Sequence, residues 1–502
     1  MTASDLAADR KLSSPGLPLA IALIGALTII RYVGLHYSRV DLFFDESQYW
    51  AWSRDLALGY FSKPPLLAWI IAASSAVCGD TEACVRAASP LFYFATSLLV
   101  YAIADALYDR RVAFWSALAV ALMPGVVFSA RIISTDVPLL FCWALALLAI
   151  VKLRASPRWR WALVFGAALG CGLLAKYAMA YVLAGLLLAA LIDRRTRALF
   201  ARPQIWAGLL IGALILLPNI VWNLNNGLVT LRHTGDNIQG AGFHLSIISA
   251  LEFLASQFGV AGPLLFGGFL LALPRMRRLR ENDRLLIAFA IPPLAIITAQ
   301  ALLRGANANW AAAAFVSAAI VVVALWVRQE RFRLIAATLA IGVMAQALLL
   351  VGDIFPYRVG LAALGPKGDA YRRTLGWREL GETVRAKADA AGAKTIAAEN
   401  RHELASLVYY LRDAPQPVRS WPVGHVPDNQ FDMTHALTEK AGEPILFVTA
   451  CGLEPRLAKQ FASVRQLDVF TVRTGPTSSR IYGAFLLSGS RGPVAPLGRC
   501  EG

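Results

Sequence analysis

About eleven apolar stretches, each close to the length that crosses a lipid bilayer, constrain what this chain can fold into. They lie near residues 17–35, 86–107, 113–129, 137–153, 161–175, 177–192, 205–222, 258–274, 285–303, 308–327 and 332–351. Of the 502 residues, 57% are hydrophobic and only 16% are charged, with a mean hydropathy of +0.55. A globular core cannot bury that much apolar side chain. The sequence therefore predicts an α-helical polytopic membrane protein with about 11 to 13 transmembrane helices.

Basic residues fall in alternate connectors between these stretches, and the positive-inside rule places those connectors in the cytoplasm. The connectors hold Arg110, Arg111, Lys152, Arg154, Arg158, Arg160, Arg194, Arg195, Arg197, Arg202, Arg275, Arg277, Arg278, Arg280, Arg284, Arg328, Arg331 and Arg333. Although the net charge is +16, no single soluble face carries it, which argues against a nucleic-acid partner. We therefore expect the first loop and the C-terminal part on the outer side.

Three blocks follow along the chain: a cytoplasmic segment 1–16, a membrane domain 17–351 with a long outer loop 36–85, and a polar tail 352–502. Within the tail, helix-like and strand-like segments alternate, beginning with 377–393 and 394–399. This alternation predicts a small soluble α/β domain. The tail shows no glycine-rich phosphate loop or catalytic triad.

Six cysteines occur without a CxxC pair, so they indicate no metal or redox motif. Cys142 and Cys171 fall inside apolar stretches, where they are expected to be buried. Two further pairs, Cys78 with Cys84 and Cys451 with Cys500, are expected on the outer side, where disulfides are permitted. The sequence leaves their pairing open.

The outer loop after the first stretch, "VDLFFDESQYWAWSRDLALGYFSKPPLLAW" (40–69), carries two adjacent acids among aromatic residues. Read as a helix lying in the membrane interface, it puts Asp45, Tyr49 and Trp52 on one face and Glu46 about 100° away. The two carboxylates then do not form a dyad, and one serves a pocket while the other holds the loop. Alternatively, Asp45 is an N-cap with Gln48 completing a capping box.

Lys63 stands in "YFSKPP", where Ser62 is expected to cap a short helix whose first turn contains Pro64 and Pro65. A cation at a helix N-terminus is unfavourable against the helix dipole, so a nearby anion would account for Lys63. The alternative is a solvated lysine that reaches toward lipid headgroups.

Other charged residues on the outer side also call for a partner. Four further cations depart from the positive-inside rule there: Arg86, Arg131, Lys176 and Arg304. Either Arg86 pairs with Glu82 or Asp80, while Lys176 and Arg304 reach lipid headgroups from helix ends, or the four cations serve an anionic ligand. Asp136 is either the N-cap of the following helix or an acid facing a cavity.

Metal binding stays an open alternative at two places. His233, Asp236 and His244 match no defined ligand spacing, so polar packing in their loop is favoured. Asp41, Asp45 and Glu46 could together hold a divalent cation or none. We therefore expect no certain cofactor.

Taken together, these motifs resemble membrane-embedded glycosyltransferases with the C-type fold. The similarity is to the protein O-mannosyltransferase superfamily and, within it, to bacterial transferases that add aminoarabinose or uronic acid to lipid A. It rests on the Asp45-Glu46 pair, "YFSKPP", "VRAASPLF", "STDVPLLFCW", "LLAKY" and "LLRGANANWAAAAF". Each motif is short, but their order and their common side of the membrane make the set specific.

The resemblance implies a monomeric enzyme of the bacterial inner membrane that transfers a sugar, with inversion, from a polyprenyl-phosphate donor to a lipid A or other envelope glycolipid on the periplasmic face. The implied catalytic acids are Asp45, Asp136 and Glu46. The donor phosphate would be held by Lys63, Arg86, Arg131, Lys176 and Arg304. The candidate substrate contacts are Tyr49, Trp52, Asn307 and Asn309.

Two departures from the family pattern concern the donor sugar. Related transferases often have Lys-Gly where this chain has Lys176-Tyr177, and a lysine-rich late loop where this chain has "RGANAN". Contacts to the donor sugar are therefore expected to differ from those of the aminoarabinose enzymes.

Alternative functions are a transporter or flippase of lipid-linked glycans, a protein O-mannosyltransferase, and a membrane sensor. A transporter should show charges near the bilayer midplane and repeated helices, whereas these charges lie in outer loops and no internal repeat is evident. Neither the sugar nor the acceptor can be read from the sequence.

Overall fold

The computed structural model describes residues 16–239, 245–358, 371, 373–424, 426–451 and 455–498. The chain forms two compact units. The helical unit contains the residues up to His36, together with Lys63–Leu67 and Arg86–Leu350. The mixed unit contains Tyr37–Ser62, Ala68–Val85 and the chain from Val351 onward. The expected cytoplasmic segment 1–16 lies almost wholly outside the described residues.

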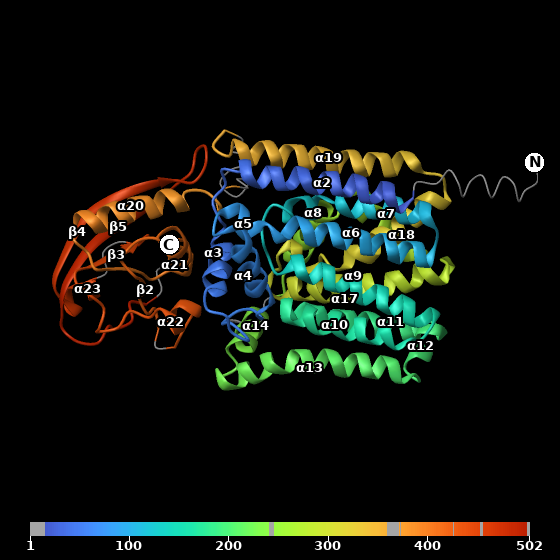
Figure 1. Cartoon of the computed structure of the whole chain (residues 1–502), viewed down its shortest axis with the longest axis horizontal. Coiled ribbons are helices and arrows are strands. Elements are labelled where there is room, and N and C mark those ends of the chain that lie inside the picture. The colour runs from blue at the N-terminus through green and yellow to red at the C-terminus, as the bar shows by residue number, and fades with distance from the viewer. Residues whose placement is uncertain are drawn as a thin grey trace, which may run out of the picture. The chain divides into compact units, whose positions relative to one another are not determined.

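Long α-helices build the helical unit (Figure 1). Its apolar runs form helices because lipid offers no hydrogen-bond partners to backbone N–H and C=O groups. A helix pairs these groups with one another within a single segment. The helices and short 3₁₀ turns are α2 (Leu17–Tyr37), α6 (Ala88–Leu107), α7 (Arg110–Ala121), α8 (Pro124–Ser129), α9 (Asp136–Ala155), α10 (Trp159–Ala175), η1 (Tyr177–Ala180), α11 (Tyr181–Ile192), α12 (Arg194–Leu199), α13 (Pro203–Asn225), α14 (Val229–Gln239), α15 (Ile247–Val260), α16 (Pro263–Ala272), η2 (Leu273–Arg278), α17 (Glu281–Arg304), η3 (Ala308–Ala311), α18 (Ala314–Arg328) and α19 (Phe332–Ile354).

Helices cover all the expected apolar stretches, but fewer of them satisfy a strict test for a span. Among the described residues, six helices are long and apolar enough to cross a membrane, or seven if α15 and the segment from α16 through η2, bent by 119°, count as one span. The expected stretch 113–129 is not one continuous helix, because the chain breaks between α7 and α8 ahead of Pro124. The expected stretches 161–175, 177–192 and 308–327 contain shorter apolar helices, α10, α11 and α18, which fall below the length of that test.

Helices α10 and α13 approach each other through small residues. A Cβ added to Gly166 would lie 2.7 Å from the carbonyl oxygen of Gly208, and one added to Gly170 would lie 2.6 Å from the Cβ of Ile215. Neither position has room for a side chain, as is common where membrane helices pack closely. This packing aligns the later part of α13 with the end of α10.

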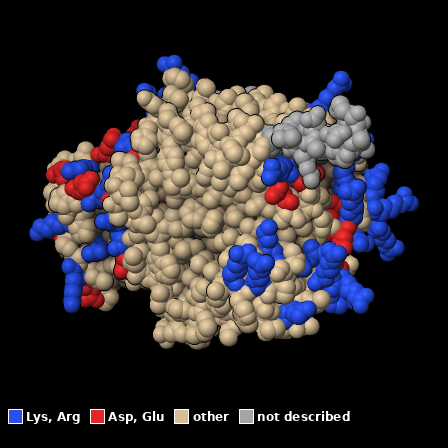
Figure 2. All heavy atoms as spheres, turned by 45° about the vertical axis from the view of Figure 1, so that its right-hand side comes forward, with Lys and Arg blue, Asp and Glu red and all other residues tan. Residues whose placement is uncertain are grey.

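One end of the helical unit collects the basic connectors. Arg154, near the end of α9, donates to Asp193 at 2.7 Å and to Glu281 at 2.9 Å. Asp283, which is fully buried, accepts from Tyr108 and from Arg328, each at 2.7 Å. These bonds bring together the ends of α6, α9, α11 and α18 and the start of α17. Figure 2 shows a wide surface with few charged side chains, and many Lys and Arg, with some Asp and Glu, toward the right-hand side of the view.

The mixed unit contains a five-stranded sheet in the order β2-β1-β3-β5-β4 among its described residues. β1 pairs in parallel with β2 and β3, whereas β5 pairs antiparallel with β3 and β4. The strands are β1 (Thr395–Ala398), β2 (Val418–Ser420), β3 (Ile445–Thr449), β4 (Phe461–Arg473) and β5 (Ser479–Ser490), and the helices of the tail are α20 (Trp377–Ala390), α21 (Arg401–Tyr410), α22 (Gln430–Thr434) and α23 (Pro455–Gln460). The expected small α/β fold is therefore present, with β2 and α22 as elements that the sequence did not predict.

The outer loop folds with the C-terminal tail as part of the mixed unit. Its helices are α3 (Phe44–Ser53), most of α4 (Leu66–Cys78) and most of α5 (Glu82–Arg86). Phe44 packs in the same hydrophobic core as Trp377, with the two rings edge to face at 6.5 Å. Asp41 accepts from the backbone N–H groups of Trp377 and Arg378 at 2.9 and 3.2 Å, and its burial raises its pKa to about 6. Asp41 thus fixes the start of α20 from the loop.

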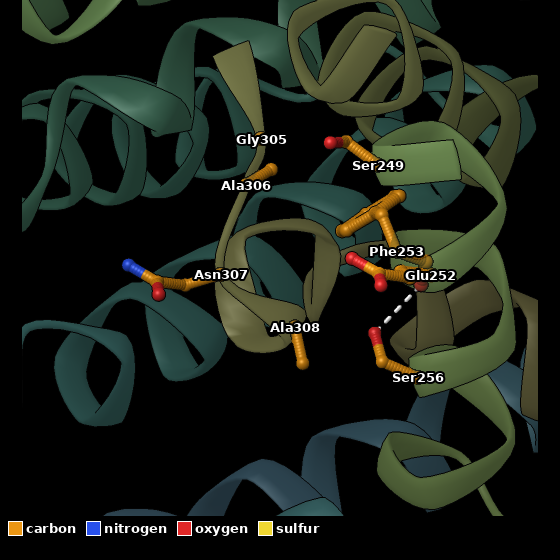
Figure 3. Close-up of a pocket in the computed structure, with 8 residues that line it drawn as sticks. All are labelled: Ser249, Glu252, Phe253, Ser256, Gly305, Ala306, Asn307 and Ala308. Atoms are coloured by element: carbon orange, nitrogen blue, oxygen red, sulfur yellow. Dashed lines mark hydrogen bonds between the residues drawn. The ribbon is translucent and has the colours of Figure 1, made fainter. Parts of the chain in front are cut away.

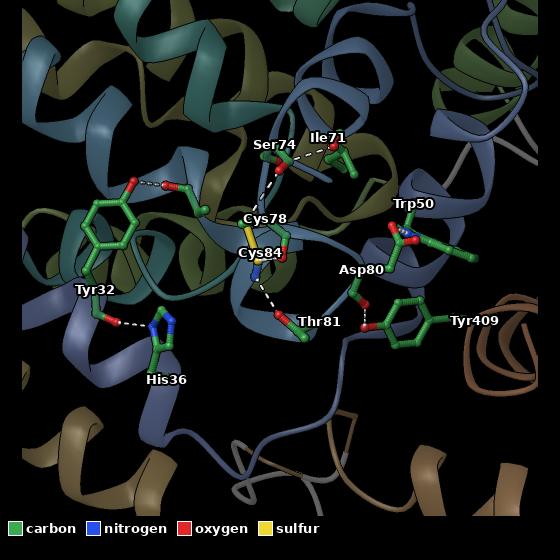
Figure 4. Close-up of a disulfide and its surroundings, with 11 residues drawn as sticks. Tyr32, His36, Trp50, Ile71, Ser74, Cys78, Asp80, Thr81, Cys84 and Tyr409 are labelled. Atoms are coloured by element: carbon green, nitrogen blue, oxygen red, sulfur yellow. Dashed lines mark hydrogen bonds between the residues drawn. A yellow bond between two sulfur atoms is a disulfide. The ribbon is translucent and has the colours of Figure 1, made fainter. Parts of the chain in front are cut away.

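A disulfide joins Cys78 to Cys84 in this loop, which settles one of the pairings that the sequence left open (Figure 4). Between the two cysteines, Asp80 accepts from the indole N–H of Trp50 at 2.7 Å and, through its carbonyl oxygen, from the hydroxyl of Tyr409 at 2.6 Å. The disulfide loop is therefore held by both α3 and α21. Cys142 is buried and Cys171 half-buried, both as free thiols, while Cys500 lies outside the described residues.

Candidate active site

Asp136 joins three segments at the end of the helical unit opposite the basic connectors. Its Oδ1 accepts from Lys176 Nζ at 2.7 Å, and its Oδ2 accepts from Asn309 Nδ2 at 2.5 Å. The N-cap of α9 is Thr135, so the alternative that Asp136 caps this helix is wrong. The carboxylate is only 7% exposed and the lysine 19%. A buried ion pair of this kind holds both charges at fixed positions.

A second set of polar side chains extends from Lys176 to α13. The hydroxyl of Tyr177 donates to Asn219 Oδ1 at 2.8 Å and accepts from Asn223 Nδ2 at 3.3 Å. Asn223 lies within the last turns of α13, one residue beyond the expected apolar stretch 205–222. Tyr177, which stands where related transferases often have glycine, therefore connects the end of α10 to α13 beside Lys176.

A pocket of about 220 Å³ opens between α15 and the segment before η3 (Figure 3). It is lined by Ser249, Glu252, Phe253, Ser256, Gly305, Ala306, Asn307 and Ala308. The carboxylate of Glu252 points toward the Gly305–Ala308 segment, whereas the carboxamide of Asn307 points away from α15 (Figure 3). Gln257 Nε2 donates to the carbonyl oxygen of Ala308 at 3.1 Å and so ties the two walls together. Glu252 is a polar contributor that the sequence analysis missed.

The remaining cations that were expected on the outer side also belong to the helical unit. Arg86 is almost fully buried, whereas Lys63, Arg131 and Arg304 are half-buried, and all four make contacts within the structure. Ser89, three residues after Arg86, donates to the carbonyl oxygen of Ile132 at 2.5 Å. The starts of α6 and α9 therefore lie at one end of the unit.

The expected helix start near Lys63 is wrong. Helix α4 begins at Leu66, so Pro64 and Pro65 precede it and Lys63 stands in an irregular segment. The argument from a helix dipole therefore does not apply to this lysine.

In the mixed unit, the two acids of the first loop have different surroundings. Helix α3 has Phe43 as its N-cap, and Glu46 Oε2 accepts from the Phe43 N–H at 2.9 Å. The alternative that Asp45 is the cap is therefore wrong. Glu46 is buried at 1% exposure, whereas the side chain of Asp45 is 33% exposed. As expected, the carboxylates point apart.

Arg401, the first residue of α21, is the partner of Asp45. Its Nη1 donates to Asp45 Oδ1 at 2.7 Å and to Gln48 Oε1 at 3.1 Å. Sequence reasoning missed Arg401, and its place at a helix N-terminus, where a cation needs an anion, was the one available signal. Tyr49 and Trp52 are buried in the same unit with their rings 5.4 Å apart.

The proposed metal ligands do not gather around a site. No group of three His, Cys, Asp or Glu residues could hold a metal ion within the part of the chain that the structure describes. The carboxylate of Asp41 accepts from the backbone N–H of Trp377 at the start of α20. That of Glu46 accepts from the backbone N–H of Phe43 at the start of α3. His244 lies outside the described residues, as does the side chain of Asp236.

Comparison with known proteins decides the family. The chain is 35% identical to the lipid A galacturonosyltransferase RgtD of Rhizobium johnstonii over 444 residues, which are 87% of this chain and 91% of that protein. The chain belongs to the C-type-fold membrane glycosyltransferases of the ArnT and protein O-mannosyltransferase superfamily. It is therefore a glycosyltransferase and a multi-pass membrane protein.

Further comparisons agree with this membership. Residues 62–222 match the family model of dolichyl-phosphate-mannose-protein mannosyltransferase. The lipopolysaccharide core galacturonosyltransferase RgtA of the same bacterium is 28% identical over 222 residues, 44% of this chain and 43% of that protein. The crystal structure of ArnT from Cupriavidus metallidurans bound to undecaprenyl phosphate has the same fold, with a TM-score of 0.66 over 92% of this chain and 97% of that one at 16% identity.

Proposed function

We propose that this glycosyltransferase moves a hexuronic acid from polyprenyl phosphate to a lipid A-type acceptor on the periplasmic face of the inner membrane. The observation that carries the proposal is the likeness to a lipid A galacturonosyltransferase along nearly the whole length of both chains. A polyprenyl-phosphate donor is supported by the undecaprenyl phosphate bound to an ArnT of the same fold.

The reaction needs a base for the acceptor and positive charge for the leaving group. The acceptor hydroxyl attacks the anomeric carbon, the bond from that carbon to the phosphate oxygen breaks, and its electron pair leaves with the polyprenyl phosphate. We propose that Asp45, the half-buried acid of α3, takes the proton of this hydroxyl. The phosphate gains a negative charge as it leaves, and fixed cations stabilise it. The cations that we assign to this role are Lys63, Arg86, Arg131, Lys176 and Arg304.

Asp136 has a different role in this proposal. Each of its two carboxylate oxygens accepts a hydrogen bond, one from Lys176 and one from Asn309, whereas the bond from Arg401 to Asp45 uses one oxygen, Oδ1. Asp136 is therefore less suited than Asp45 to take a proton. We assign it to hold the lysine ammonium in position for the donor phosphate. Glu46, which caps α3, holds the helix that presents Asp45.

The pocket beside Asn307 is assigned to sugar hydroxyls. Two serine hydroxyls and the Glu252 carboxylate line it, and hydroxyl groups of a sugar bond readily to such donors and acceptors. The loop "RGANAN", where this chain departs from the aminoarabinose enzymes, forms one wall of it.

A reconstituted assay tests the proposal. The purified full-length protein, in detergent with phospholipid, is incubated with lipid A and polyprenyl-phosphate galacturonate. The masses of the lipid products are then measured by mass spectrometry. We expect lipid A to gain one hexuronic acid, and the Asp45→Asn variant to lose at least a hundredfold in rate while unfolding at the parent temperature. Unmodified lipid A with the parent enzyme would refute the proposed reaction, and full activity of Asp45→Asn would refute the assigned base.

A further inference from the structure

The contact between Arg401 and Asp45 lies open to the surface of the mixed unit. The two side chains are 35% and 33% exposed, so neither is sealed in the core. Arg401 uses a single nitrogen, Nη1, for its bonds to both Asp45 and Gln48. A guanidinium group is planar and can bind a carboxylate through two nitrogens at once. The geometry therefore leaves room for a different carboxylate to bind Arg401 through more of its donors.

The surroundings of this pair are electropositive. Next to Arg401, the ring of His402 lies against that of Phe44, with the centroids 3.8 Å apart and the planes tilted by 38°. Burial, together with the charges of Arg401, Arg480 and Arg373, lowers the pKa of His402 to about 4. Asp45 opposes this effect but does not outweigh it. The dipole at the start of α21 adds partial positive charge. An anion from the substrate would thus be favoured here.

The assigned base is also the partner of this arginine. A carboxylate that accepts from a guanidinium has less capacity to take a proton from an acceptor hydroxyl, because the cation stabilises its ionised form. Efficient transfer therefore requires that Arg401 be drawn away from Asp45 when the correct donor is bound.

We propose that Arg401 recognises the carboxylate of the donor's uronic acid, exchanging Asp45 for it and thereby freeing Asp45 to act as the base. This inference rests on the proposed function and names the residue that selects its sugar. The exchange replaces the charge-assisted pair of Arg401 with Asp45 by one of Arg401 with the uronic acid. The exchange therefore costs little free energy when the donor sugar carries a carboxylate. A neutral hexose has no carboxylate to offer and leaves Asp45 paired.

The test compares two donors in the full-length parent enzyme and three variants of it. Polyprenyl-phosphate galacturonate and polyprenyl-phosphate galactose are supplied with the same acceptor, and kcat/KM is measured for each. Arg401→Gln should lower kcat/KM for galacturonate roughly tenfold to a hundredfold relative to galactose, the range of one charge-assisted hydrogen bond. Arg401→Lys keeps the positive charge but lacks the planar guanidinium group with its several donors. Its ratio of kcat/KM for galacturonate to kcat/KM for galactose should lie between those of the parent and Arg401→Gln.

Arg412→Gln is the matched control. Arg412 follows the other end of α21, where it donates to the carbonyl oxygen of Tyr409, and its loss should leave the donor ratio unchanged. A donor ratio unaltered in Arg401→Gln, with the parent active on galacturonate, would overturn the inference and leave the proposed function standing. A raised KM for the acceptor with an unchanged donor ratio would also overturn it, and would assign Arg401 to an acceptor phosphate. A parent that transfers galactose but no galacturonate would overturn both.

Discussion

Asp136 illustrates how much one carboxylate can organise in a membrane protein. Its two oxygens accept from Lys176 at the end of α10 and from Asn309 after α17, so one side chain joins the ends of three apolar helices. At low dielectric such a pair is costly to break, because a lone ammonium would remain with little water around it. The carboxylate thus fixes an ammonium that would otherwise move freely on four methylene groups.

Replacing Asp136 by Asn should impair both stability and donor use. The amide keeps the size and one acceptor but leaves the ammonium of Lys176 without a counter-charge, so we expect a loss of about 3 kcal/mol of stability. We also expect KM for the polyprenyl-phosphate donor to rise more than KM for the acceptor. A double-mutant cycle with Lys176→Met, followed by thermal unfolding in detergent, measures the coupling. Strictly additive effects of the two substitutions would contradict a functional pair.

Single residues also mark the limit of what the sequence could predict. The divergence of Asp45 and Glu46 followed from helix geometry alone, because adjacent residues on a helix point about 100° apart. Arg401 could not be assigned to Asp45 in the same way, because 356 positions separate them and helix periodicity carries no information across that distance. For the same reason, the hydrogen bond from the amide of Asn309, a residue expected to contact the sugar, to Asp136 could not be predicted from the sequence.

At the scale of elements, α21 contributes more than one ionisable group to the mixed unit. Glu403 in its first turn is 6% exposed and accepts from the hydroxyl of Tyr482 on β5 at 3.4 Å. Burial raises the pKa of this carboxyl from 4.5 to about 7. The folded chain therefore favours the protonated acid. Its contribution to stability is complete below pH 4.5 and is lost as the pH rises to about 7.

Replacing Glu403 by Gln should remove this dependence. A glutamine stays neutral at every pH, so the parent should lose up to about 3 kcal/mol more stability than the variant between pH 5 and pH 8. Thermal unfolding of both proteins at the two pH values measures the difference. The raised pKa of Asp41 and the lowered pKa of His402 act equally in both proteins and cancel in the comparison. Parallel curves for parent and variant would contradict the assignment.

Local sequence patterns predicted the longer elements and failed at the short ones. Helix α20 and strand β1 follow the expected segments 377–393 and 394–399, because each carries a clear apolar period or run. Strand β2 has only three residues, too few to show alternation. Helix α4 was expected to include Pro64 and Pro65, but proline is tolerated in a first turn without being required there.

Across the whole molecule, the number of spans and their orientation rest on different physical evidence. Helices such as α10, with 17 residues, extend roughly 25 Å, a little less than the hydrocarbon core of a bilayer, so length alone does not decide whether they cross it. Charge is more informative, since the basic connectors meet at one end of the helical unit through pairs such as Arg154 with Asp193. We therefore propose eleven spans with that end in the cytoplasm and the mixed unit in the periplasm.

Cysteine labelling of intact spheroplasts checks this orientation. Ser463 is exposed on β4 of the mixed unit, and Arg195, 74% exposed, lies among the basic connectors. We expect Ser463→Cys to react with a membrane-impermeant maleimide in intact spheroplasts and Arg195→Cys to react only after permeabilisation, because the bilayer separates the reagent from the cytoplasmic end. Parent protein, whose free thiols Cys142 and Cys171 lie in apolar helices, supplies the background. Labelling of Arg195→Cys in intact spheroplasts, with Ser463→Cys protected, would reverse the topology and with it the periplasmic placement of the reaction.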